Sequence, residues 1–332
     1  MAKKKKAAPA DAAAQQDAAG EQPSTSGRGR SYTVSMAVPG SMIDNTQNIE
    51  FATFVAGQVA RCAAIFNVDE LVVIDDSPAA AKRDGSVGAG AAFLARVAQY
   101  LETPQYLRKA LIPMHSDLRL AGLLPPLDAP HHMRASEWKP YREGLVLKVQ
   151  PGVGSYVDIG LDRMAFVPQA VAVNTRVTLA VGESPQVQFM PDFGESMILG
   201  QVVPPSQPRE AEGLYWGYSV RLAQGLSGLL HESPFKGGYD LKIGTSERGQ
   251  VVAPGNLQLP RFKHVLVAFG GPGGLEEAAE HDKAVAGRET AELFGLYLNT
   301  CAQQGSRTIR TEEAILISMS FLETALHSFG GR

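Results

Sequence analysis

The chain has 332 residues, 44% of them hydrophobic, and a formal net charge of −3 at pH 7, which is enough apolar material for one large domain or two ordinary ones. Its two cysteines, Cys62 and Cys301, are too few for a cysteine-based zinc site. Because no apolar run has membrane-spanning length and no signal peptide is evident, we expect a soluble protein of a reducing compartment in which both thiols stay free.

Residues 1–30 differ from the rest of the chain in composition. Lys3–Lys6 precede a run of Ala, Gln, Pro, Ser and Gly that offers almost nothing to bury, so we expect a disordered basic tail. The lysine run is either a nuclear or nucleolar signal, which leaves a cytoplasmic pool open, or a solubilising arm. The tail carries six basic and three acidic residues, so residues 31–332 carry a net charge of −6. Any nucleic-acid-binding surface there must therefore be a local patch.

Strands and helices alternate from Tyr32 onward. A strand over residues 32–38 precedes a helix with apolar residues at helical spacing, and a second strand follows at Leu71–Ile74. A glycine-rich stretch at 84–90 then leads into another amphipathic segment. This alternation predicts a parallel sheet with both faces covered. The segment lacks a Gly-x-Gly-x-x-Gly fingerprint, which argues against a dinucleotide-dependent dehydrogenase.

Short alternating runs replace this pattern between about residues 141 and 203. Proline, glycine and asparagine separate five runs, which predicts a small OB-like β-barrel. The runs are Gly144–Val149, Ser155–Ile159, Met164–Val167, Arg176–Val181 and Met197–Val203. The α/β pattern resumes at Gly213–Arg221, so the barrel is an insertion. We therefore expect one α/β domain in two parts, residues 31–138 and 208–332, interrupted by an inserted module at 139–207.

Two apolar runs near the C-terminus each end in a turn of glycine or small polar residues. Val265–Phe269 precedes a glycine-rich loop, and Phe294–Asn299 precedes a turn that enters a helix. Thr311 is the expected N-cap of that helix, and acidic residues follow at its positive end. Because glycine turns after buried strands let the backbone approach a ligand closely, the two turns predict a cofactor pocket.

The loop Gly271–Leu275 and the run Ile309–Ala314 resemble the corresponding segments of the SPOUT-class methyltransferases, most closely those that methylate N3 of uridine in ribosomal RNA. From Tyr32 to about Leu326 the chain resembles the eukaryotic and archaeal members with an OB-like insertion. The resemblance implies a C-terminal trefoil knot, S-adenosylmethionine as cofactor, large-subunit ribosomal RNA as substrate, a homodimer, and neither metal nor membrane. Two alternatives stay open: 2′-O-methylation of ribose, and an RNA-binding scaffold with a vestigial methyltransferase fold.

Three residues are candidates for the catalytic step. Without the resemblance, Arg61 is best interpreted as an exposed helix arginine. The resemblance implies instead an arginine that faces the target nucleotide and stabilises negative charge. Arg310 and Glu312 lie where the last turn enters its helix, and either could assist the loss of the N3 proton. The residues do not decide between them.

The resemblance also implies that the loop Lys242–Gly249 lines the cofactor pocket. The candidate cofactor-binding residues are Gly244, Thr245, Arg248, Gly270, Gly271, Leu298, Asn299, Gly305 and Thr308.

RNA contact is expected within residues 104–148, where seven basic residues outnumber four acidic ones and aromatic residues are interleaved. The candidate RNA-binding residues are Arg108, Lys109, Arg134, Trp138, Arg142 and Lys148. His115, His131 and His132 lie in the same region without the spacing of a metal site, so we interpret them as loop histidines with local hydrogen bonds.

Overall fold

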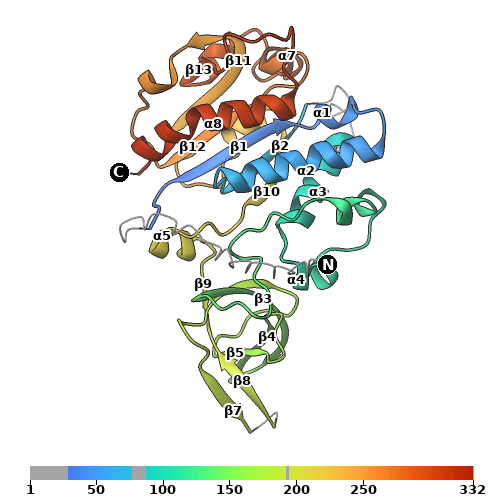
Figure 1. The fold of residues 1–332 in the computed structure, drawn as a ribbon, viewed down its shortest axis with the longest axis vertical. Helices are drawn as coiled ribbons and strands as arrows, with labels where there is room; N and C mark the ends of the chain where they lie inside the picture. The colour runs from blue at the N-terminus through green and yellow to red at the C-terminus, as the bar shows by residue number, and fades with distance from the viewer. Residues whose placement is uncertain (1–28, 77–86, 192–193, 332) are drawn as a thin grey trace, which may run out of the picture.

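The computed structural model describes residues 29–76, 87–191 and 194–331. They form a parallel sheet covered by helices and a second, mostly antiparallel sheet at one end of the molecule (Figure 1). The expected disordered tail lies outside the described residues except for Gly29 and Arg30, and part of the glycine-rich stretch at 84–90 also lies outside them.

Six strands of the described residues form one sheet in the order β10-β2-β1-β12-β11-β13, and every neighbouring pair is parallel. The strands are β1 (Thr33–Pro39), β2 (Glu70–Asp75), β10 (Ser219–Gln224), β11 (Leu241–Val251), β12 (His264–Ala268) and β13 (Leu296–Asn299). β1 and β2 are buried at every position, because both faces of the sheet are covered. The predicted parallel sheet is confirmed.

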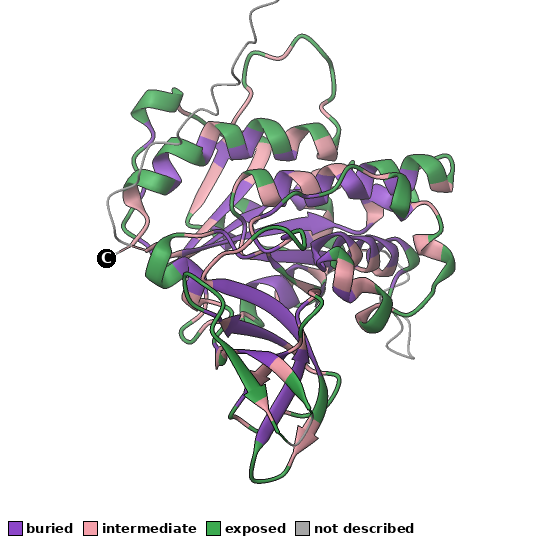
Figure 2. Cartoon of the chain, turned by 60° about the horizontal axis from the view of Figure 1, so that its bottom comes forward, coloured by how far each residue is buried: buried purple, intermediate pink, exposed green. Residues whose placement is uncertain are grey.

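Helices cover both faces of this sheet, and Figure 2 shows the buried strands between them. Helices α2, α3 and α8 pack on one face and α6 and α7 on the other. Alternate residues of β1 serve the two cores: Met36 and Val38 face the first and Ala37 the second. The helices are α1 (Ser41–Asp44), α2 (Ile49–Ile65), α3 (Ala89–Glu102), α4 (Gln105–Leu111), α5 (Gln207–Glu212), α6 (Gly225–His231), α7 (Gly274–His281) and α8 (Thr311–Phe329), with 3-10 turns η2 (Ser116–Leu118), η3 (Ala121–Leu123), η4 (Pro254–Asn256) and η5 (Thr290–Leu293).

The first and last long helices begin differently. Asn48 caps α2 with its side-chain oxygen, which accepts from the Phe51 N–H at 2.8 Å. The prediction of Thr311 as the N-cap of α8 is wrong, because the N-cap is Arg310. Its N–H donates to the Glu313 carboxylate at 2.9 Å, which leaves the Thr311 hydroxyl available for a different contact described below. Among the described residues, none of these helices is both long and apolar enough to cross a membrane.

The second sheet has the order β7-β8-β5-β4-β3-β6-β9 and is antiparallel except for the β5/β8 pair. Its strands are β3 (Tyr141–Gln150), β4 (Gly154–Asp158), β5 (Ala165–Val167), β6 (Arg176–Ala180), β7 (Val187–Met190), β8 (Glu195–Leu199) and β9 (Gln201–Val203). All five predicted runs contain strands, but the last is divided into β8 and β9. β7 was not predicted; it is an edge strand in which no residue is buried.

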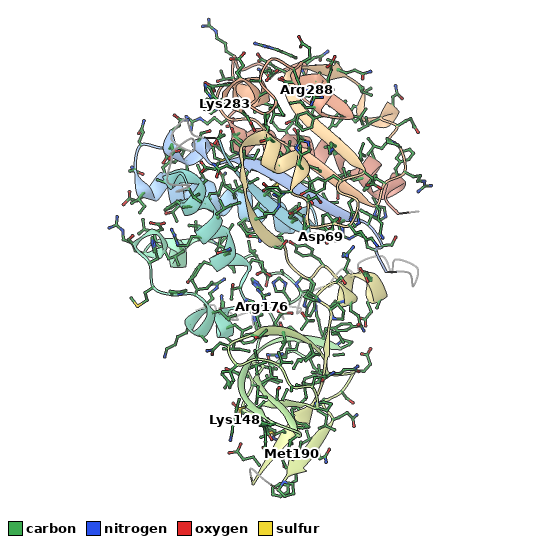
Figure 3. The ribbon with its side chains drawn as sticks, turned by 180° about the vertical axis from the view of Figure 1, so that it is seen from behind. Asp69, Lys148, Arg176, Met190, Lys283 and Arg288 are labelled. Atoms are coloured by element: carbon green, nitrogen blue, oxygen red, sulfur yellow. The ribbon has the colours of Figure 1, made fainter. Side chains whose placement is uncertain are left out.

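Polar contacts join the second sheet to the part of the chain that contains the parallel sheet. The Tyr106 hydroxyl donates to the Glu143 carbonyl at 2.8 Å, and the Trp216 indole N–H donates to the Glu143 carboxylate at 2.6 Å. Figure 3 shows Arg176 at this junction. Tyr106 precedes the strands of the second sheet in the chain and Trp216 follows them, so the second sheet is held to the rest of the protein from both flanking segments.

Candidate cofactor pocket and RNA-contact residues

A pocket of about 450 Å³ lies at the carboxyl edge of the parallel sheet. Residues 245–248 of β11 and residues that follow β12 and β13 line it together with the start of α8. Open α/β sheets bind their ligands at this edge, because turns and helix ends converge there. The pocket therefore lies where the two C-terminal glycine turns predicted a cofactor site.

The loop after β12 forms one wall of the pocket and folds tightly on itself. A Cβ on Gly270 would lie 2.3 Å from the carbonyl carbon of Gly274, and Gly274 itself has φ of +80°, a conformation that favours glycine. The Thr311 hydroxyl donates to the Gly270 carbonyl at 3.1 Å. This bond ties the first turn of α8 to the loop.

The predicted loop Lys242–Gly249 is not a separate loop, because β11 continues to Val251. Its pairing with β13 is interrupted, since both Thr245 and Gln250 are opposite Leu298. The residues between them leave the ladder as a bulge and contribute to the pocket wall. Side chains hold the bulge in place: Asn299 Nδ2 donates to the Glu247 carbonyl at 2.8 Å.

Six of the nine candidate cofactor-binding residues line this one pocket. They are Thr245, Arg248, Gly270, Gly271, Asn299 and Thr308. The structure does not place the other three in the lining. Gly244 lies in β11, where an added Cβ would be 2.7 Å from the Tyr297 ring, Leu298 is a core residue, and Gly305 is exposed with nothing within 4 Å of an added Cβ.

Several polar residues of the pocket were not among the predicted site residues. Ser246 Oγ donates to Glu276 Oε1 at 2.8 Å, and the hydroxyl oxygens of Thr300 and Ser318 lie 2.7 Å apart. Ser246 belongs to the segment that the resemblance had indicated. Ser318 carried no such signal, because its position on α8 reads as one small polar residue among apolar ones.

Arg61 lies on α2, away from the cofactor pocket, and lines a different hollow with Leu127 and Tyr215. Its Nη1 donates to the carbonyls of Pro126 and Leu127 at 3.0 and 2.9 Å. The guanidinium thus anchors a connecting segment, which neither the exposed-helix interpretation nor the catalytic one had indicated.

Arg310 and Glu312 flank the cofactor pocket, but neither belongs to its lining. The Arg310 side chain is 65% exposed, and its nearest Glu312 oxygen is 3.9 Å away. Its guanidinium carbon lies 5.8 Å from the centre of the Phe51 ring on α2. Arg310 therefore contacts α2 rather than the pocket.

The six candidate RNA-binding residues differ in exposure. Lys109, Arg134 and Lys148 are exposed. Trp138 is half-buried, and its indole N–H donates to the Gly182 carbonyl at 2.8 Å. Arg108 is also half-buried, and its guanidinium donates to the carbonyls of Thr103 and Leu101.

Arg142 does not lie on the surface: it is 1% exposed. Its Nε donates to the Ile159 carbonyl at 2.6 Å and its Nη1 to the Glu137 carbonyl at 3.1 Å. Because buried charge must be hydrogen-bonded, this side chain serves the junction between the two sheets and is out of reach of RNA in this conformation.

The histidines have the local hydrogen bonds that the sequence analysis expected. His115 Nδ1 accepts from the Asp117 N–H at 3.2 Å, and the Nε2 atoms of His131 and His132 lie 3.0 and 2.7 Å from the Glu102 carbonyl. Burial, reinforced by His131, lowers the pKa of His132 to about 4. Within the described ranges, no group of three or more His, Cys, Asp or Glu side chains is placed to hold a metal ion.

The comparison with known proteins places this chain in a family of RNA methyltransferases. Residues 33–322 match the model of the family described as "Putative RNA methyltransferase", and since this match spans most of the chain, the chain belongs to that family. The 28S rRNA (uridine-N(3))-methyltransferase of Homo sapiens is 49% identical over 314 residues, which cover 92% of this chain and 81% of the human protein. The protein of the same name from Mus musculus is 47% identical over 316 residues, 92% of this chain and 80% of its own length. The Drosophila melanogaster protein of that name is 41% identical over 309 residues, 89% of this chain and 62% of its own length.

Proposed function

We propose that this chain transfers a methyl group from S-adenosylmethionine to N3 of a uridine in large-subunit ribosomal RNA. The observation that carries the proposal is the pocket at the carboxyl edge of the parallel sheet, in a chain that is 49% identical to a 28S rRNA (uridine-N(3))-methyltransferase over most of its length.

The pocket fits a cofactor of this kind in size and chemistry. Its volume of about 450 Å³ falls within the roughly 300–1,000 Å³ usual for small-molecule sites. The glycine loop after β12 presents backbone amides and carbonyls for an adenine ring, while Thr245 and Asn299 offer polar groups for ribose hydroxyls. When bound, S-adenosylmethionine supplies an electrophilic methyl group. The chain's own residues orient it and exclude water from one side.

The class we propose is SPOUT, with a C-terminal trefoil knot. In support, β13 lies beyond β11 and away from β12, which precedes it in the chain. The chain then returns across the sheet as α8, which packs against α2 and is bonded at Thr311 to the Gly270 carbonyl (Figure 1).

We propose that residues 139–207 are an OB-like module inserted between the two parts of the methyltransferase domain, 31–138 and 208–332. In support, β6-β3-β4-β5-β8 follow one another in the second sheet, with a single parallel pair at β5/β8. This arrangement fits a partly open barrel of five main strands.

The active form we propose is a homodimer. Phe51, Phe54, Leu316 and Ile317 are 36% to 52% exposed on α2 and α8, and these two helices pack side by side. Exposed apolar groups on neighbouring helices favour a protein interface. Because Ile317 also lines the cofactor pocket, a second copy seated there would border the pocket and could present its own Arg61 or Arg310 to the substrate.

Nuclear or nucleolar localisation is part of the proposal, with a cytoplasmic pool left open. Its support is the Lys3–Lys6 run of the tail and the site of ribosome assembly implied by an rRNA substrate. Deletion of the tail from a fluorescently tagged chain tests this point directly.

The test of the activity is transfer of labelled methyl from S-adenosylmethionine to total RNA from cells that lack this protein, followed by nucleoside analysis. Label in 3-methyluridine supports the proposal. Label in a 2′-O-methyl nucleoside keeps the class of enzyme and overturns the chemistry. Absence of both label and cofactor binding by the folded protein favours an RNA-binding scaffold with a vestigial pocket.

A further inference from the structure

A smaller pocket of about 250 Å³ adjoins the cofactor pocket at the same edge of the sheet. The two pockets share Gly271, Pro272 and Gly274 as a common wall. The other walls of the smaller pocket come from Ser41, which follows β1, from Asp76, which follows β2, and from α7. In the sheet order, β1 lies between β2 and β12, so this pocket is at the point where connections leave in opposite directions, the usual place for a ligand in such sheets.

Asp76 is fixed at the wall between the two pockets. Its Oδ1 accepts from the Ser41 N–H at 2.9 Å and its Oδ2 from the Ser41 hydroxyl at 2.6 Å. A Cβ added to Gly271 would lie 2.8 Å from Ser41 Oγ and 3.5 Å from Asp76 Oδ2. The absence of a side chain at Gly271 therefore leaves the Asp76 carboxylate close to the cofactor pocket.

The surroundings make this carboxylate a better proton acceptor than an exposed one. Desolvation raises the pKa of Asp76 against the hydrogen bonds from Ser41, and the neighbouring charge of Asp75 adds to the increase. The other titratable groups nearby are Asp44 at the end of α1, and Glu277 and His281 on α7. Glu277 is exposed, so water solvates its charge, whereas Asp76 is partly buried.

We propose that Asp76 accepts the N3 proton of the target uridine, whose uracil ring occupies the smaller pocket; this inference rests on the proposed function. The N3–H bond breaks and its proton passes to Asp76 Oδ. N3 then forms a bond to the methyl carbon, and the electron pair of the broken carbon–sulfur bond stays on sulfur, giving S-adenosylhomocysteine and 3-methyluridine. Asp76 afterwards releases the proton to water.

Asp76 suits this role better than the two residues at the start of α8. Arg310 and Glu312 line neither pocket, and the exposed Arg310 guanidinium is committed to Glu312 and the Phe51 ring. A general base must lie within hydrogen-bond reach of the proton that it removes. Asp76 lines the smaller pocket together with Gly271 and is partly buried, whereas Glu277 lines the same pocket but is exposed.

The decisive variant is Asp76→Asn in the full chain, assayed for kcat on unmodified large-subunit rRNA transcript with S-adenosylmethionine. We expect kcat near neutral pH to fall by about 10² to 10⁴, the usual contribution of a general base. The loss shrinks as pH rises, because uridine N3 then ionises without help. The Kd of S-adenosylmethionine stays within about twofold of the wild-type value, and the matched control Glu280→Gln, an exposed carboxylate of α7, keeps wild-type kcat.

A second measurement does not depend on activity. Asp76→Ala removes the acceptor for the N3–H, so we expect severalfold weaker binding of the unmodified transcript and no change for a transcript bearing 3-methyluridine, which lacks that hydrogen. Asp76→Asn keeps a carbonyl oxygen and therefore keeps the affinity. Equal losses for both transcripts would mean that Asp76 only maintains the fold, and would overturn the proposal.

The remaining outcomes separate the inference from the function. Methyl transfer by the wild-type chain together with an unimpaired Asp76→Asn variant overturns the role of Asp76 and leaves the function intact. If Glu277→Gln or Glu312→Gln lowers kcat and high pH restores it, while Asp76→Asn keeps the wild-type kcat, then the glutamate replaced in that variant accepts the N3 proton instead of Asp76. No transfer by the wild-type chain overturns the proposed function itself.

Discussion

Arg176 and Glu102 form a two-point ion pair across the junction of the two sheets, with Nη1 and Nη2 of the arginine 2.6 and 3.0 Å from the two carboxylate oxygens. Glu102 ends α3 and Arg176 begins β6. Burial alone would raise the pKa of Glu102, but Arg176 and a hydrogen bond from His131 outweigh it and hold the pKa at about 2. The same guanidinium donates to Glu143 at 2.6 Å, so a single side chain connects α3 to two strands of the second sheet.

We predict that Arg176→Met lowers the free energy of unfolding by about 3–5 kcal/mol, because it leaves two carboxylates buried without their cation. Urea denaturation measures this loss, with exposed Arg163 as the matched control: Arg163→Met should change stability by less than about 0.5 kcal/mol. Equal stabilities of the two variants would mean that solvent reaches the pair and screens it.

His132 gives this junction a dependence on pH. Its pKa in the folded state, about 4, is below its value of 6.5 when exposed, first because of burial and then because of His131. Between these values the unfolded chain binds more protons than the folded one, so stability is lost as pH falls from about 6.5 to 4. We expect a loss of about 3 kcal/mol across this window, seen as a falling Tm. His132→Gln should remove this dependence and His115→Gln, at an exposed site, should keep it. A slope retained in His132→Gln would assign the proton to another group.

The arrangement of the fold could be predicted from the sequence where burial leaves a pattern. β1 and β2 are buried at every position, so their apolar runs were recognisable, and the short strands of the second sheet alternate because one face packs on a core. β7 could not be predicted in this way, because none of its residues is buried and its sequence therefore need not alternate between apolar and polar residues. The β11 bulge was also hidden, since its interruption is defined by pairing with β13, a strand some fifty residues later in the chain.

Site residues were predictable as segments, but less so one by one. Glycine turns and their neighbours indicated the segments that line the candidate cofactor pocket. Composition could not tell that Arg142 is buried, because a basic residue between aromatic ones looks the same whether it contacts RNA or donates to the Ile159 carbonyl. Asp76 carried no signal either, since an aspartate after a strand is common and only the fold brings it to Gly271.

Gly244 and Gly305 give a direct test of which glycines have a packing role. A Cβ at Gly244 would lie 2.7 and 2.8 Å from the rings of Tyr297 and Phe294, whereas one at Gly305 meets nothing within 4 Å. We expect Gly244→Ala to cost about 1–3 kcal/mol of stability through overpacking, and Gly305→Ala to be nearly neutral. Thermal denaturation of both variants checks this. A neutral Gly244→Ala would show that the two rings move aside at little cost.

Thr311 connects the start of α8 to the cofactor loop through its bond to the Gly270 carbonyl. Thr311→Val removes this bond at nearly constant volume, and we expect S-adenosylmethionine to bind about fivefold more weakly, the effect of a hydrogen bond worth about 1 kcal/mol. Isothermal titration calorimetry measures the change. Thr324, exposed on the same helix, provides the control, and Thr324→Val should bind as the wild type does. An unchanged Kd for Thr311→Val would mean that the hydrogen bond between Thr311 and Gly270 does not contribute to the shape of the pocket.

Exposed and buried basic residues of the proposed RNA-contact region should behave differently. Lys148 is exposed on the second sheet, far from Lys283 at the other end of the molecule (Figure 3). We predict that Lys148→Ala weakens binding of single-stranded rRNA severalfold and reduces the slope of log K against log salt by about 0.7, the effect of one lost phosphate contact. Lys283→Ala should leave both quantities unchanged.

Arg142→Met should instead lower Tm, because the Arg142 guanidinium donates to backbone carbonyls inside the junction. The affinity for RNA should be preserved in the protein that remains folded. If Arg142→Met weakened RNA binding without a change in Tm, the junction would have to open to bring this arginine to the RNA.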